Sequence, residues 1–179
     1  MVAVDPLASL ASRDIWVTLD GHEYRLPAKP AIDWLEVILT GDSYGILPGW
    51  LDVEDQQKIF DAMWADRIND VELEQATQDA LTAAAGRPWW WAAQLVLVCA
   101  ATNKSWSTLH GRVVLAGVDP GVVPLGAYID ALYAACLEGF GSNQEARQKF
   151  DVHMDTPPPS VGLDEESEGE AFMALLNGG

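Results

Sequence analysis

Basic residues are scarce in this chain of 179 residues. It carries 10 Lys and Arg against 27 Asp and Glu, which gives a formal net charge of −17 at pH 7. No basic patch or stripe offsets this charge, and an acidic surface repels phosphate groups. We therefore expect neither nucleic acid nor an anionic membrane among the partners.

The sequence also has few cysteines and no targeting signal. The first eleven residues lack the basic and the apolar region of a signal peptide. Cys99 and Cys136 are the two cysteines, and both lie in apolar, helix-like stretches. Buried, reduced thiols are the simplest interpretation, with a disulfide as the alternative. We expect a soluble, intracellular protein.

Catalytic and metal-binding patterns are nearly absent. His22, His110 and His153 form no helical pair and no Cys/His spacing of a zinc site. No glycine loop with a lysine is present that would bind phosphates. The segment 41–45 matches the G-x-S-x-G nucleophile motif around Ser43, but a predicted helix precedes it where that motif needs a strand. We predict a protein that is not an enzyme and uses no cofactor or metal.

The most distinctive segment is an apolar run with three consecutive tryptophans at its head, Trp89, Trp90 and Trp91. Residues 88–101 read as a helix, too short to cross a bilayer, which takes roughly 20 apolar residues. Successive helical residues are 100° apart, so the three tryptophans together cover about 200° of the helix circumference. A single core-facing stripe of a helix is narrower than that. Either this is a central core helix, or some tryptophans form a surface for a partner.

The pattern of apolar residues and breakers predicts a mainly α protein, a helical bundle with a small N-terminal β-hairpin packed on it. Asp20-Gly21 is a two-residue hairpin turn between strands 15–19 and 22–26. Apolar periodicity and caps predict helices over 31–40, 53–68, 71–85, 88–102, 105–116, 124–137 and 143–154, with Asp52 and Asp70 as the N-caps of the second and third. The first helix is expected to bury one apolar face: Ile32, Trp34, Leu35, Ile38 and Leu39. The second has the apolar set Ile59, Phe60, Met63, Trp64 and Ile68. We expect a flexible leader at 1–13 and a single domain at 14–154.

After Asp155 the composition changes. A proline run at 157–159 and an acidic run at 164–170 predict a disordered, acidic C-terminal tail over 155–179. The tail carries a short apolar end, which we interpret as a client mimic that covers the binding groove at high effective concentration. The alternative is a segment without a binding role. With the three tryptophans, its apolar residues complete the predicted partner-binding set: Phe172, Met173, Leu175 and Leu176.

Several of these segments together resemble a known family. They are the hairpin 14–28, Trp34-Leu35, the loop 46–49, the Arg87-Pro88-Trp89-Trp90-Trp91-Ala92-Ala93 stretch and the helix opening at 124–128. In this combination the chain resembles the tail assembly chaperones of long-tailed bacteriophages that infect actinobacteria. The resemblance covers roughly residues 14–140 and consists of hydrophobic and turn motifs, with no catalytic signature.

The resemblance implies a function by binding. Such chaperones are small, mostly helical proteins of the host cytoplasm that are absent from the mature virion. They bind the tape measure protein, keep it soluble and pass it to polymerising tail-tube subunits. Partners implied here are the tape measure protein, with the tail-tube protein and self-association as further candidates. Two other functions stay open: a structural or adaptor protein such as a head-tail connector, and a hydrolase built on Ser43.

Overall fold

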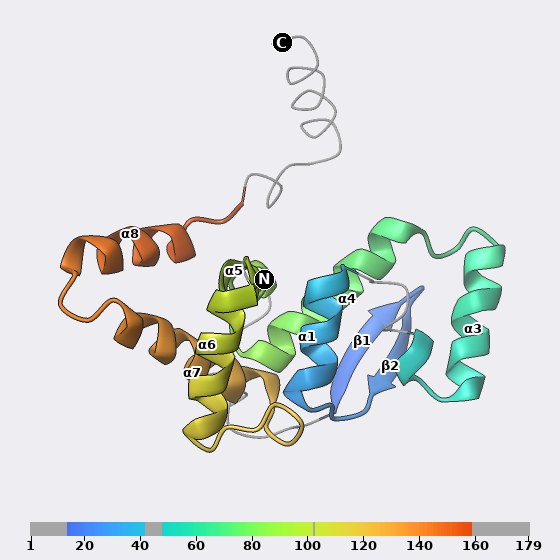
Figure 1. Cartoon of the computed structure of the whole chain (residues 1–179). Coiled ribbons are helices and arrows are strands. Elements are labelled where there is room, and N and C mark those ends of the chain that lie inside the picture. Colours follow the sequence, from blue (N-terminus) through green and yellow to red (C-terminus); the bar gives the residue numbers. More distant parts are fainter. Residues whose placement is uncertain (1–13, 42–47, 102, 159–179) are drawn as a thin grey trace, which may run out of the picture.

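The computed structural model describes residues 14–41, 48–101 and 103–158 (Figure 1). The described chain is mainly helical and begins with a two-stranded antiparallel hairpin, so the predicted fold class is confirmed. The expected leader 1–13 and residues 159–179 of the expected tail lie outside the described residues. The elements are β1 (Ile15–Leu19), β2 (His22–Leu26), α1 (Ala31–Thr40), α3 (Val53–Trp64), α4 (Asp70–Ala85), α5 (Trp89–Ala100), α6 (Asn103–Leu115), α7 (Leu125–Gly139) and α8 (Gln144–Asp155).

The hairpin forms where its turn residues predict it. Asp20 and Gly21 both have positive φ, 49° and 73°, which matches the twist of the flanking strands. The register pairs Ile15 with Leu26 and Leu19 with His22. One face is buried and packs on α4, and the Arg67 side chain forms an ion pair with Asp20 from beyond α3. A hairpin alone is marginal in water, so this packing is what stabilises it.

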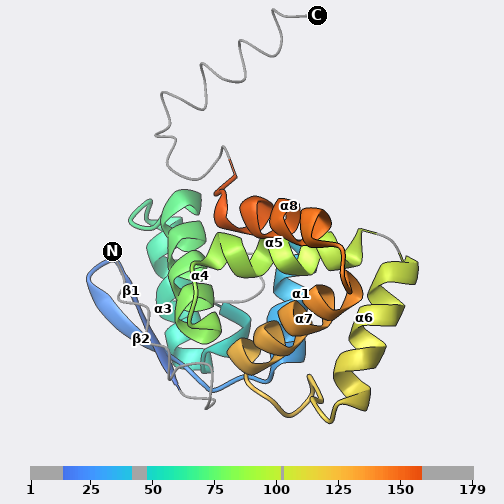
Figure 2. The same cartoon turned by 90° about the vertical axis from the view of Figure 1, so that its left-hand side faces the viewer.

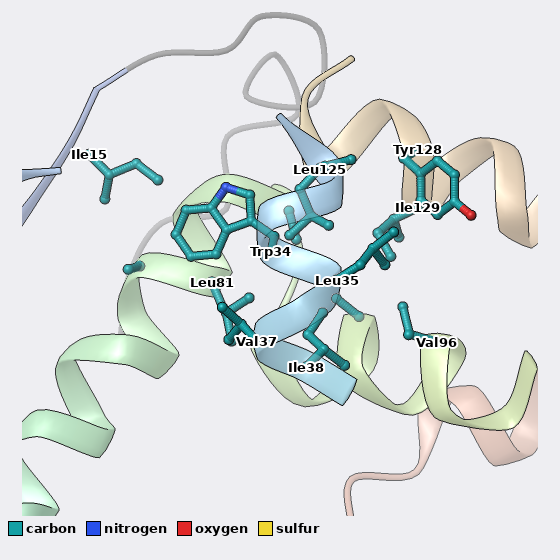
Figure 3. Packing of buried hydrophobic residues seen from close by; sticks show 14 of the residues in the cluster. Ile15, Trp34, Leu35, Val37, Ile38, Leu81, Val96, Leu125, Tyr128 and Ile129 are labelled. Atoms are coloured by element: carbon teal, nitrogen blue, oxygen red, sulfur yellow. The ribbon is translucent and has the colours of Figure 1, made fainter. Parts of the chain in front are cut away.

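Helix α1 lies between the hairpin side of the molecule and the helices α5 and α7. Figure 3 shows Trp34 on the side of Ile15 and Leu81, and Leu35 toward Ile129. The α1 N-terminus has no side-chain cap. Instead, the N–H groups of its first two residues donate to the carbonyl oxygens of Val123 and Pro120, at 2.8 and 2.9 Å.

The predicted buried face of α1 was partly wrong. Ile32 and Leu39, expected in the core, are 48% and 45% exposed, whereas Val37 is buried. The two backbone bonds to the loop before α7 hold the start of the helix there and set its rotation. That constraint is tertiary and leaves no trace in the local periodicity.

The next two helices have well-formed caps. Asp52 accepts from the N–H of Asp55 at the start of α3, as expected. The helix was expected to reach Ile68 but ends at Trp64, because Asp66 takes a left-handed conformation (φ 53°). For α4 the cap is Asn69, one residue before the predicted Asp70, in a reciprocal capping box with Glu72.

Helix α5 is the centre of the helical part. It contacts α1, α4, α6, α7 and α8, and Figure 2 shows α8 lying along it. Pro88 precedes the helix as its N-cap and is not the first helical residue as predicted. Among the described residues no helix has the length and apolar character to cross a membrane.

Helix α8 is held against α5 and α7 by aromatic and polar contacts. Phe150 and Met154 of α8 are buried, and the Phe150 ring stacks on Tyr133 of α7 with centroids 5.8 Å apart. The Tyr133 hydroxyl donates to Asp151 Oδ1 at 2.8 Å. Val152, the third apolar residue of this polar helix, is exposed. The packed domain therefore extends through α8.

Candidate partner-binding groove

The three tryptophans of α5 have different environments. Trp91 is 7% exposed, contacts Tyr133 edge-on at 5.2 Å and lies under the Arg87 guanidinium at 4.5 Å. Arg87 is held in place by Asp130 Oδ1, 2.6 Å from its Nη2. Trp91 thus belongs to the core. Trp89 and Trp90 are half-buried and lie at the surface of the helix.

The start of α5 is fixed by α4. The backbone N–H of Trp89 donates to the Thr82 hydroxyl at 3.1 Å. Thr82 in turn donates to the carbonyl of Gln78 within α4. Since this N–H belongs to the first helical residue, it has no intrahelical acceptor, and Thr82 supplies one. The bond ties the N-terminus of α5 to α4.

Along the outer side of α5 runs an open groove of about 440 Å³. Its lining is apolar except for one glutamine: Trp89, Trp90, Ala93, Gln94, Leu97, Val98, Ala101 and Pro158. Apart from Pro158, these residues follow the three- and four-residue spacing of one helix face. Leu97 is 51% exposed and Val98 38%, so the described chain covers this face of a central helix only in part.

Gln94 connects the groove to α8. Its Nε2 donates to the His153 carbonyl at 2.8 Å and lies 3.0 Å from His153 Nε2. Its Oε1 is buried and has no hydrogen-bond partner among the described residues. The contact ties the C-terminal part of α8 to α5, and Pro158, three residues past the helix, then reaches the groove. Pro158, the last described residue, therefore lies at the groove.

Of the predicted binding residues, the structure brings Trp89 and Trp90 together in the groove and places Trp91 in the core. Phe172, Met173, Leu175 and Leu176 lie outside the described residues. Leu97, Val98 and Pro158, which also line the groove, were not among the predicted binding residues. The spacing of the two on α5 could have indicated them, because positions 90, 94, 97 and 101 lie on one face of a helix with the tryptophans.

Each of the three histidines lies within hydrogen-bond distance of another protein group. His22 Nδ1 lies 2.9 Å from the Asp20 carbonyl, and His110 Nδ1 lies 2.8 Å from the Tyr128 hydroxyl. The His110 ring also stacks on Trp106. Within the described ranges, no three His, Cys, Asp or Glu side chains are grouped to hold a metal ion. Ser43 of the nucleophile-like motif lies outside the described residues.

The two cysteines lie side by side in the core. Cys99 Sγ and Cys136 Sγ are 3.3 Å apart, and both thiols are free and buried. The hydrogen bond to Cys136, together with burial, raises the pKa of Cys99. A protonated, buried thiol such as that of Cys99 is a poor nucleophile. Both side chains are buried where α5 packs against α7.

Comparison with known proteins adds no relative. No protein-family model, curated protein or solved structure matches the chain. The apolar groove on α5 is therefore the feature of the described residues on which a function can be argued.

Proposed function

We propose that the protein is a bacteriophage tail assembly chaperone that binds apolar helical segments of the tape measure protein in the α5 groove. The observation that carries the proposal is the partly uncovered face of α5, where the half-buried Trp89 and Trp90 and the exposed Leu97 and Val98 line a common groove. Such a face suits helix-in-groove recognition, in which an amphipathic helix inserts its apolar residues.

The size and openness of the groove fit a chaperone's task. Its volume is near the lower end of the roughly 300–1,000 Å³ typical of ligand pockets. Each apolar side chain buried there contributes about 1.5–3 kcal/mol before the cost of association. Binding through a few such side chains is reversible, and a chaperone must release its client when tube subunits polymerise.

The charge distribution supports the same role. A net charge of −17 keeps the chaperone and its complex soluble and repels DNA. The client would bind in the apolar α5 groove, while the rest of the surface is acidic. We place the protein in the host cytoplasm during infection and outside the mature virion.

Co-expression with the tape measure protein of the same genome tests the proposal. The measured quantity is the soluble fraction of the tape measure protein. Leu97→Glu puts a charge in the groove and should abolish solubilisation, whereas Leu115→Glu is a matched control. Leu115 is another exposed leucine, 90% exposed at the end of α6 and outside the groove. Equal solubilisation by wild type and Leu97→Glu would reject the groove as the client site.

Mass spectrometry of purified virions separates the chaperone from a connector. A chaperone should be missing from particles, while a connector should be present at a fixed copy number. Detection at a constant ratio to the tail-tube protein would replace the proposed function with the connector alternative.

A further inference from the structure

The described chain ends at the edge of the groove. Helix α8 is fixed along α5 by the Gln94–His153 contact, and three residues beyond its last residue Pro158 forms part of the groove lining. Residue 159 is bonded to Pro158, so the rest of the chain is tethered to the proposed client site.

Such a segment follows within reach. Twelve residues, 159–170, separate Pro158 from the apolar segment 171–176, which contains Phe172, Met173, Leu175 and Leu176. A chain of twelve residues spans on average about 20 Å, and α5 itself is about 18 Å long. The linker is thus long enough for the segment to return to any point of the groove and short enough to keep it nearby.

The chemistry of the segment matches the lining. The groove offers no charged side chain, and residues 171–176 carry none. The acidic residues lie in the linker, where Asp164, Glu165, Glu166, Glu168 and Glu170 can stay in water. An apolar segment whose neighbouring charges lie in the linker can enter this groove without burying a charge.

From this geometry we infer that residues 171–176 occupy the α5 groove of their own chain and compete with the client. The inference rests on the proposed function in taking the groove as the client site. A linker of twelve residues gives an effective concentration of about 1 mM. A segment with a dissociation constant of about 100 μM would then fill about nine-tenths of the grooves and weaken client binding about tenfold.

The test uses a fluorescent peptide with the sequence of residues 159–179, added to the full chain. In the triple variant Phe172→Ser, Leu175→Ser, Leu176→Ser the groove is left open, and the peptide should bind five to ten times more tightly than to wild type. The control variant Val161→Ser, Leu163→Ser removes the apolar residues of the linker and should bind the peptide as wild type does. Fluorescence anisotropy measures all three affinities.

Groove variants locate the binding. Added to the triple variant, Leu97→Glu should abolish peptide binding, while Leu115→Glu should leave it unchanged. Sedimentation equilibrium should show a monomer at every concentration measured, because the segment binds its own chain. A dimer that dissociates on Leu97→Glu would show that the segment binds a second copy instead and would overturn the inference.

Two further results would also overturn it. One is that wild type and the triple variant differ less than twofold in their affinity for the peptide. The other is that the Val161→Ser, Leu163→Ser control binds the peptide more tightly than wild type does. Client solubilisation is read separately. If Leu97→Glu abolishes solubilisation but the peptide does not bind the open groove, the proposed function stands and this inference fails. If the peptide binds the open groove but the protein does not solubilise the tape measure protein, the segment still occupies the groove and the proposed function fails.

Discussion

Replacing each α5 tryptophan by alanine should separate core from groove. Trp91→Ala removes a side chain that is 7% exposed, and a buried Trp or Phe replaced by Ala costs about 3–5 kcal/mol. Part of that loss is the edge contact with Tyr133, 5.2 Å between centroids, where such a contact contributes about 0.5–1.5 kcal/mol. The Arg87 guanidinium 4.5 Å from the ring adds about 0.5–1 kcal/mol at a partly exposed site.

Trp90 lies half-buried in the groove and faces solvent on one side. Its replacement should therefore cost clearly less stability than that of Trp91, and Trp89→Ala should behave like Trp90→Ala. In a domain of this size, 1 kcal/mol shifts the melting temperature by about 2–4 °C. Trp91→Ala is thus expected to melt roughly 6–20 °C below wild type.

Urea unfolding followed by far-UV circular dichroism measures the free energies, with a common slope confirming that each variant unfolds from the same native state. The same proteins are then titrated with an apolar client helix. Trp90→Ala should weaken client binding while staying folded. Equal destabilisation by all three substitutions would show that α5 is simply a core helix, and the groove assignment of Trp89 and Trp90 would be refuted.

Three further predictions concern the rest of the fold. Burial raises the pKa of Tyr128 to about 12, and burial with the Asp151 hydrogen bond raises that of Tyr133 to about 12. Because an unfolded tyrosine titrates near pH 10, the folded state keeps protons that the unfolded state loses. The stability that these tyrosines contribute is complete below pH 10 and is lost as the pH rises toward 12. Urea unfolding at several pH values should show that the free energy of unfolding falls less steeply with pH in Tyr128→Phe than in wild type. A free energy of unfolding that does not change with pH in wild type would contradict the argument. Cys99 and Cys136 should react with a thiol reagent such as DTNB only after unfolding, since both are buried; rapid reaction of the native protein would show that α5 and α7 separate. Asn69→Ala should cost about 1 kcal/mol through loss of the capping box, and Asp70→Ala less; the opposite order in thermal unfolding would restore the cap to Asp70.

The sequence predicts correctly the features that depend on neighbouring residues: the hairpin turn, the ends of α1 and α4 and the buried face of α7. The Asp20-Gly21 turn sets the hairpin register, and Gly41 and Gly86 end α1 and α4 in the left-handed conformation that glycine adopts without strain. The apolar stripe of α7 is buried as predicted, apart from the half-buried Tyr133. In each case residues within a turn of one another decide the outcome.

The misplaced features depend on distant partners. Ile32 and Leu39 are exposed because a loop some 90 residues away holds the α1 N-terminus. Trp64 was expected on the apolar side of its helix and is 88% exposed. Which tryptophan of α5 is buried depends on Tyr133 and Arg87, and Pro158 enters the groove only because α8 lies along α5. Periodicity finds a face but does not say what covers it.

The anchoring of α1 has a consequence for how the protein forms during synthesis. The acceptors for the Ala31 and Ile32 N–H groups, Val123 and Pro120, leave the ribosome long after the hairpin and α1 have emerged. Until then the start of α1 is solvated, and the helix, only 10 residues long, is marginal by itself. The start of α1 therefore gains its two acceptors only with the second half of the chain, so the Ala31 and Ile32 amides should become protected from hydrogen exchange no earlier than α7.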